Sequence, residues 1–308
     1  MSVTYTDDYT RTWSRDGEIA FLALSDGTRL RYLKTGKGPT LVLLHTLRTQ
    51  LDYFQRLIPK LKDHYTVYAL DLPGLGWSDI GAGASYEEPA ARKAIVEFVE
   101  GLDLTDVTLA GESIGATMSL TASTQLGARV RQVIALNTYD YPEGVERANL
   151  LASIVVKAMR IPIFGRVVSS MNNVKILGGI MRGGFFDRSK LPLDFVKEQM
   201  RSGKRRGYSA VDTGYFGALP SYIAARKLYP RVNVPVTLVY GDHDWSKLED
   251  RAETAHLLPG SKVITLSRSG HFGSLEHPEE IAGILIKAAR SASKTPSKQK
   301  PKSTGGEL

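Results

Sequence analysis

Short apolar runs alternate with longer amphipathic stretches along most of the chain. Continuous apolar runs at residues 40–45, 65–70, 107–109, 130–136, 234–240 and 262–266 predict strands buried on both faces of a parallel sheet. Apolar positions at helical spacing predict helices at residues 49–64, 90–102, 114–125, 247–258 and 278–289. Residues 19–24 and 28–33, joined by Ser25-Asp26-Gly27, predict a hairpin. This order predicts an α/β fold with a doubly wound, mostly parallel sheet.

The alternation stops at Asn137 and resumes at residue 232. Residues 138–231 are punctuated by glycine, show helical periodicity and contain no convincing strand. A break of this length is too long for a loop and predicts an inserted helical cap. We therefore expect a core made of residues 1–137 and 232–290, a cap of residues 138–231, and a disordered basic tail at residues 291–308, where Lys, Ser, Pro and Gly dominate.

The net charge of +8 is concentrated in two places. Residues 141–231 hold 16 Lys and Arg against 6 Asp and Glu, the tail is basic, and the remainder of the chain is net acidic. This distribution argues against a nucleic-acid-binding domain. The absence of cysteine excludes disulfides and cysteine nucleophiles. We found no metal-ligand spacing and no dinucleotide fingerprint, so no metal and no cofactor are expected.

The N-terminal residues 1–17 are polar and lack the apolar core of a signal peptide. No run of about 18 apolar residues occurs, so no transmembrane segment is expected. The sequence therefore favours a cytoplasmic protein.

The richest motif is Gly111-Glu112-Ser113-Ile114-Gly115, between a predicted strand and a predicted helix. A direct strand-to-helix turn forces its corner residue to positive φ and requires small neighbours, and it presents the serine hydroxyl as a nucleophile. A serine nucleophile needs a base and an orienting acid, which a parallel sheet supplies after later strands. His271 follows one such strand. Asp244 follows another, with Asp242 as the alternative acid.

Four motifs together resemble the α/β-hydrolase superfamily, in its serine-nucleophile, lid-containing, esterase- or lipase-like branch. They are the Gly-x-Ser-x-Gly turn, the Asp71-x-Pro73-Gly74-x-Gly76-x-Ser78 turn, Gly241-x-x-Asp244, and Gly270-His271 followed by Glu276-x-Pro278. The resemblance implies a triad of Ser113, His271 and Asp244. It also implies an oxyanion hole made by the N–H groups of Leu47 and Ile114.

Several residues around this triad have expected supporting roles. Thr46 stands where the family has glycine, His45 is expected to position the oxyanion loop, and Asp71 to hydrogen-bond its own turn. The candidate substrate-binding residues are Arg48, Trp245 and Phe272.

The expected activity is cleavage of a small carboxylic ester with a hydrophobic acyl or alkyl group, through an acyl-enzyme. Ser113 argues against relatives that open epoxides or displace halide, because these use a carboxylate nucleophile. Carbon–carbon bond hydrolysis of dienone acids and cofactor-free perhydrolysis use the same triad and stay as alternatives, as does a non-catalytic receptor or scaffold.

The apolar stripes of the cap are expected to roof the pocket. The alternative is that the basic cap, including Lys204-Arg205-Arg206, contacts anionic lipid or an acidic substrate.

Overall fold

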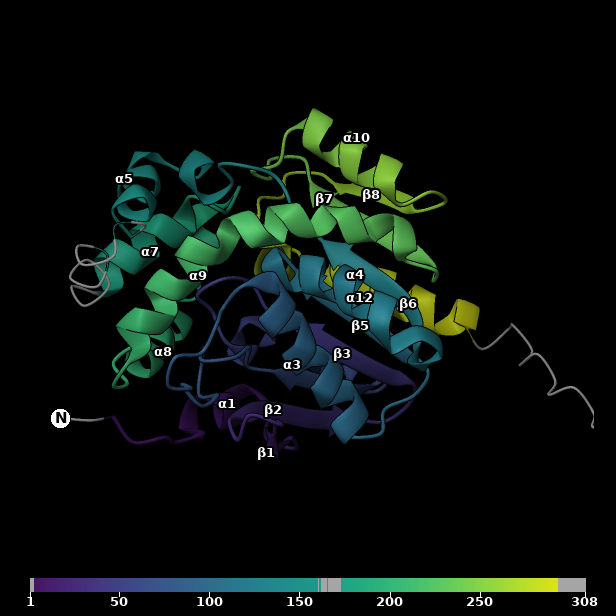
Figure 1. The fold of residues 1–308 in the computed structure, drawn as a ribbon, viewed down its shortest axis with the longest axis horizontal. Coiled ribbons are helices and arrows are strands. Elements are labelled where there is room, and N and C mark those ends of the chain that lie inside the picture. Colours follow the sequence, from purple (N-terminus) through teal and green to yellow (C-terminus); the bar gives the residue numbers. More distant parts are fainter. Residues whose placement is uncertain (1–2, 160, 162–164, 166–172, 293–308) are drawn as a thin grey trace, which may run out of the picture.

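The computed structural model describes residues 3–159, 161, 165 and 173–292, and it is built on one eight-stranded sheet (Figure 1). The strand order is β1-β2-β4-β3-β5-β6-β7-β8. Strand β2 pairs antiparallel with β1 and β4, and all other neighbours are parallel. The strands are β1 (Glu18–Ala23), β2 (Arg29–Gly36), β3 (Thr40–Leu44), β4 (Thr66–Leu70), β5 (Val107–Glu112), β6 (Val130–Leu136), β7 (Val236–Gly241) and β8 (Lys262–Leu266). The predicted α/β fold class is confirmed.

Helices cover both faces of this sheet. In Figure 1, α3 and α4 lie in front of the strands and α12 lies behind them. The helices outside residues 138–231 are α1 (Asp8–Trp13), α2 (Ile58–Leu61), α3 (Glu88–Gly101), α4 (Ile114–Leu126), α10 (Leu248–Leu257), α11 (Gly273–Glu276) and α12 (Pro278–Ala292), with the 3-10 turns η1 (Leu51–Phe54) and η2 (Gly127–Arg129). This layering places the carboxyl ends of the parallel strands at one edge, where the candidate residues lie.

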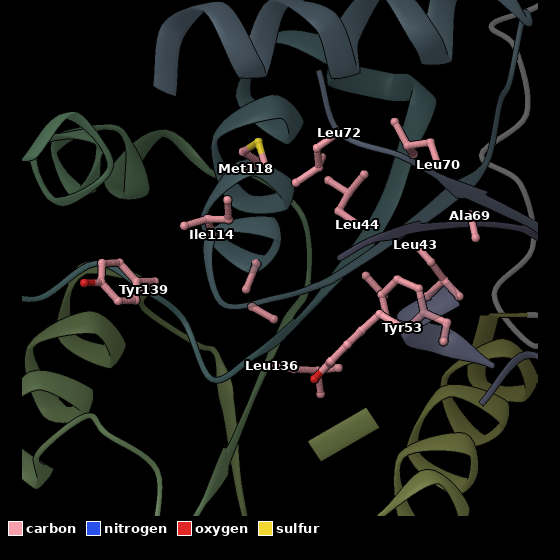
Figure 2. Packing of buried hydrophobic residues seen from close by; sticks show 14 of the residues in the cluster. Leu43, Leu44, Tyr53, Ala69, Leu70, Leu72, Ile114, Met118, Leu136 and Tyr139 are labelled. Carbon is pink, nitrogen blue, oxygen red and sulfur yellow. The ribbon is translucent and has the colours of Figure 1, made fainter. Parts of the chain in front are cut away.

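The centre of the core is formed where β3 and β4 meet the helices. Residues Leu43 and Leu44 of β3 pair in register with Ala69 and Leu70 of β4. Because successive strand residues point to opposite faces, Leu43 packs on the side of Tyr53 while Leu44 packs toward α4 (Figure 2). These residues are fully or almost fully buried, which explains the continuous apolar runs in the sequence.

The predicted continuous helix at residues 49–64 is wrong. The structure has instead the 3-10 turn η1 and, after a break, the short helix α2. Pro59 lies in the first turn of α2, and its missing N–H and ring cannot be accommodated inside a longer helix. The apolar residues that suggested the helix are nevertheless buried: Leu51, Phe54, Leu57, Ile58 and Leu61.

The described part of residues 138–231 is helical and contains no strand. It holds α5 (Leu150–Met159), α7 (Val174–Arg182), α8 (Leu193–Ser202) and α9 (Tyr208–Ala224), with the 3-10 turns η3 (Val145–Arg147), η4 (Arg188–Lys190) and η5 (Ala225–Arg231). In Figure 1 these helices lie together to one side of the strands, with α9 reaching across toward α4. The predicted tail at residues 291–308 lies outside the described residues, apart from its first two, which end α12.

Candidate active site

Ser113 occupies the corner between β5 and α4. Its backbone has φ 61° and ψ −122°, the positive-φ conformation that a direct strand-to-helix turn requires. The two flanking glycines are needed for space. A Cβ on Gly111 would lie 2.2 Å from the Gly115 carbonyl oxygen, and a Cβ on Gly115 would lie 2.2 Å from the Leu44 carbonyl oxygen. The Gly-x-Ser-x-Gly pattern is therefore explained by close backbone approach.

His271 is hydrogen-bonded to Asp244, and both side chains are completely buried. Nδ1 of His271 lies 2.5 Å from Oδ1 of Asp244. Burial raises the pKa of the Asp244 carboxyl, but the charge of His271 and hydrogen bonds from His271 and Ser246 outweigh burial and leave that pKa below its ordinary value. Nε2 of His271 is buried and has no hydrogen-bond partner among the described residues. The imidazole thus keeps one nitrogen for a further partner.

The alternative acid, Asp242, has a different task. Its carboxylate accepts hydrogen bonds from the backbone N–H groups of Arg268 and Ser269, and it bonds to His243. These contacts fix the turn that precedes His271. The histidine's carboxylate partner is therefore Asp244, the residue that the family resemblance favoured.

Asn137 links the end of strand β7, just before Asp244, to the loop between β8 and α11 that carries His271, which we call the histidine loop. Its Oδ1 accepts a hydrogen bond from the Gly241 N–H at 2.9 Å, and its Nδ2 donates to the His271 carbonyl oxygen at 2.9 Å. The residue has φ 45°, a left-handed conformation that asparagine tolerates better than most residues. Sequence reasoning missed this role. The available signal was a polar residue directly after a buried strand at the carboxyl edge of the sheet.

Two buried carboxylates complete the support of the histidine loop. Glu112 accepts from the Gly273 N–H at 2.6 Å and from the Ser274 hydroxyl at 2.6 Å. Glu276 accepts from the N–H groups of Gly270 and Asp187, which ties the loop to the 138–231 segment. Burial raises the pKa of Glu112, although hydrogen bonds from Ser274 and the charge of His271 act against the rise. Glu112 therefore holds the loop that carries His271.

The loop after β3 lies against the Ser113 turn, since a Cβ on Gly115 would lie 2.6 Å from the His45 carbonyl oxygen. Leu47 N–H makes no hydrogen bond to any described residue, and Ile114, as the first residue of α4, has an N–H for which the helix provides no acceptor. Thr46 is absent from the positive-φ residues of the described chain, whereas Arg48 has φ 56°. Thr46 is therefore not strained, because the left-handed conformation in this loop occurs two residues later, at Arg48.

His45 and Asp71 hold this loop in place. The Leu72 N–H donates to Nε2 of His45, so the proton of this imidazole is on Nδ1, which donates to the Thr46 carbonyl oxygen at 2.8 Å. Burial lowers the pKa of His45 to about 4, which keeps the ring neutral. Asp71 accepts from the N–H groups of Leu51 and Trp77. The structural roles predicted for both residues are confirmed.

Ser113 lies at the wall of a cavity. The cavity is bounded by the loop after β3, by the loops that carry Trp245 and Phe272, and by residues 138–231. Most of the lining is apolar: Leu47, Val145, Val155, Val156, Leu177, Ile180, Met181, Phe216, Trp245 and Phe272, with Thr46, Arg48, Thr49 and Ser113 as the polar residues. All three candidate substrate-binding residues therefore line the same cavity as Ser113.

Two of these lining residues have partners that the sequence did not indicate. Arg48 forms an ion pair with Asp212 of α9, with Nη2 3.1 Å from Oδ2, and the Asp212 side chain is buried. The indole of Trp245 stacks on the His271 imidazole, with ring centroids 3.8 Å apart and an interplanar angle of 13°. The charge of Arg48 is thus offset at the cavity wall, and Trp245 contacts the candidate base directly.

Comparison with known proteins agrees with this architecture. A model of the alpha/beta hydrolase family matches residues 41–284, and the chain belongs to this family. An uncharacterized hydrolase of Bacillus subtilis, YugF, is 27% identical over 254 residues, covering 79% of this chain and 87% of that protein. Haloalkane dehalogenase 2 of Mycobacterium tuberculosis is 25% identical over 277 residues, covering 84% of this chain and 90% of that protein.

A solved structure shows the same fold. The crystal structure of Cfl2 from Burkholderia cenocepacia superposes with a TM-score of 0.77 at 21% identity, covering 88% of this chain and 95% of that one. The protein is therefore a hydrolase with the α/β-hydrolase fold. None of the helices in the described part of the chain is both long and apolar enough to cross a bilayer.

Proposed function

We propose that the protein is a serine hydrolase that cleaves a neutral carboxylic ester with a hydrophobic acyl or alkyl group. The observation that carries the proposal is the combination of Ser113, at a strained strand-to-helix corner on the cavity wall, with a buried His271–Asp244 pair whose chain neighbours Phe272 and Trp245 line the same cavity. A hydroxyl in this position with a base and an orienting acid is the arrangement needed for nucleophilic catalysis.

In the proposed reaction, Ser113 Oγ attacks the ester carbonyl carbon while Nε2 of His271 takes the hydroxyl proton. Asp244 keeps the imidazole oriented and stabilises its positive charge. The N–H groups of Leu47 and Ile114 bind the oxyanion of the tetrahedral intermediate. The alcohol leaves with the proton from His271. Water then releases the acyl group, with His271 again acting as base and then as acid.

The cavity supports a neutral, apolar substrate. Most of its lining is apolar, and helices α5, α7 and α9 supply much of it, so we propose that residues 138–231 form the lid of the site. Arg48 is the one lining residue that favours an acidic dienone substrate. Its ion pair with Asp212 offsets that charge, which is why we place esters ahead of dienone acids.

A panel of substrates tests the proposal. Wild-type protein and Ser113→Ala are incubated with p-nitrophenyl esters of short and medium acyl chains, with a dienone acid, and with acetate plus hydrogen peroxide. We expect release of p-nitrophenolate by the wild type alone. Faster cleavage of the dienone acid, or peracid formation without ester cleavage, would replace the ester assignment. Binding of the compounds without any turnover would favour a receptor.

A further inference from the structure

The outer faces of α5 and α7 carry apolar side chains that are exposed to solvent. Leu150 is 78% exposed, Ile154 58%, Leu151 41% and Ile176 37%. We call these four residues the outer apolar surface. A helix on the surface of a globular protein ordinarily turns polar residues outward. Single exposed leucines are common, but a group on neighbouring helices marks an interaction site.

The two helices are adjacent, so these residues form one surface. Nδ2 of Asn149, directly before α5, donates to the Gly179 carbonyl oxygen of α7 at 3.3 Å. A Cβ on Gly179 would lie 3.4 Å from a methyl group of Leu151. In Figure 1, α5 and α7 lie together at the left, away from β7 and β8.

Other apolar residues of the same helices line the cavity. Val155 and Val156 of α5 and Leu177 and Ile180 of α7 face the space that Ser113 adjoins. The apolar residues of both helices therefore continue from the cavity onto the exposed surface. The inward residues are explained by the cavity, whereas the outward ones have no such explanation within the described part of the protein.

The charges on these helices are all positive. Lys157 is the only charged residue of α5, and Lys175 and Arg182 are the only ones of α7. Lys157 and Lys175 are exposed, and helical spacing places Lys157 on the same side as Leu150 and Ile154. An apolar surface flanked by cations matches the interfacial region of a bilayer that contains anionic lipid.

One residue of the basic cluster that the sequence offered as an alternative lipid contact faces inward. Arg205 of the Lys204-Arg205-Arg206 run is directed into the protein, where it donates to the carbonyl oxygens of Ser78 at 2.7 Å and Gly74 at 2.6 Å. It anchors the helical segment to the turn at residues 71–78. Arg205 is therefore not available to lipid. The exposed apolar residues that could contact lipid lie instead on α5 and α7.

We propose that the outer apolar surface, together with Lys157 and Lys175, docks on an anionic lipid surface. The leucine and isoleucine side chains enter the boundary between headgroups and acyl chains, and the lysines bind the anionic headgroups. Docking places the helices that line the Ser113 cavity directly against the lipid.

Vesicle binding tests this proposal without any measurement of activity. The full chain is sedimented with phosphatidylcholine vesicles, with and without phosphatidylglycerol. We expect binding that is stronger with phosphatidylglycerol and weaker at high salt. The double variant Leu150→Ser/Ile154→Ser should lose at least about tenfold in partitioning, because two apolar side chains no longer leave water. Lys157→Ala and Lys175→Ala should each cost about fivefold, and only on anionic vesicles.

Leu248→Ser is the matched control, since Leu248 of α10 is 76% exposed but lies outside the outer apolar surface. It should bind vesicles as the wild type does. Thermal unfolding of every variant verifies that the fold is intact, and exposed positions should leave it unchanged.

Three results would overturn the proposal. The first is no binding of the wild type to either vesicle. The second is an equal loss in Leu248→Ser and in the double variant. The third is binding that depends on the lysines but is unaffected in the double variant. Concentration-dependent self-association that the double variant abolishes, without vesicle binding, would instead assign the surface to a second copy of the chain.

Discussion

Replacing Asn137 removes the connection between strand β7, which precedes Asp244, and the loop that carries His271. In Asn137→Ala, the Gly241 N–H loses its acceptor and the His271 carbonyl oxygen loses its donor, and both lie in the protein interior. Each unsatisfied buried group costs about 1–3 kcal/mol. Alanine at φ 45° adds about 1 kcal/mol. The expected destabilisation is therefore about 3–7 kcal/mol, or a fall in Tm of roughly 10 °C for a domain of this size.

The catalytic effect should appear in kcat rather than in KM. Asn137 is not among the cavity-lining residues, so substrate binding should change little, whereas a displaced His271 should lower kcat by about 10–100-fold. Melting followed by circular dichroism and steady-state hydrolysis of a p-nitrophenyl ester measure the two effects.

Two further substitutions separate the contributions. Asn137→Gly loses both hydrogen bonds but tolerates the backbone conformation, so it should be about 1 kcal/mol more stable than Asn137→Ala. Asn137→Asp keeps the acceptor for Gly241 but replaces the donor to His271 by a carboxylate oxygen that faces the His271 carbonyl oxygen and Glu112, so it should be less stable than Asn137→Gly. If Asn137→Ala melted within about 2 °C of the wild type and kept its kcat, the linking role of Asn137 would be refuted.

Three other outcomes are expected. Trp245→Leu should lower kcat about 3–10-fold through loss of the stack on His271, while Trp245→Phe should retain most of the activity; equal losses in the two would exclude a role for the ring. Asp212→Asn should raise hydrolysis of a dicarboxylic acid monoester relative to a neutral ester about tenfold, because Arg48 loses its ion-pair partner; an unchanged ratio would contradict charge balancing. The Asp244 pKa is lowered in the folded state, so its contribution to stability is present above about pH 4 and is lost as the pH falls through the folded pKa; unfolding between about pH 2 and 6 should therefore be less acid-sensitive in Asp244→Asn.

Much of the fold is readable from the sequence because each parallel strand is locally distinctive. Strand β6, for example, lies inside the sheet, and in the sequence it is an apolar run that ends directly before the polar residue Asn137. The continuous helix predicted at residues 49–64 does not form, because Pro59 restricts helix α2 to a start just before it, whatever the apolar spacing upstream. Burial of Leu51 and Phe54 was correctly indicated, but the backbone between them and α2 is not helical.

The candidate site divides in the same way. Ser113, Asp244 and His271 could be proposed as a triad because each follows a strand at the carboxyl edge, in the order that the family resemblance implies. The roles of Asn137 and Asp212 depend on which distant groups they contact. From the sequence, Asp212 would be expected to face solvent, as most charged residues on helices do. Its ion pair with Arg48 forms only because α9 packs over the loop after β3.

The apolar stripes of residues 138–231 show the same limit. The sequence predicted that residues 138–231 are helical, but the apolar residues of α5 and α7 are divided between the cavity and the exposed surface. Which side faces the cavity is decided by tertiary packing, so the outward position of Leu150 and Ile154 could not be read from the sequence.

Intact mass after treatment with a fluorophosphonate shows whether Ser113 is an activated nucleophile, on which the whole proposed reaction depends. The reagent phosphonylates a serine only when a base and an oxyanion hole assist the attack. We predict a single adduct on the wild type, none on Ser113→Ala, and very slow labelling of His271→Ala. An unlabelled wild type, or an adduct that persists in Ser113→Ala, would contradict the assignment of Ser113 as the nucleophile.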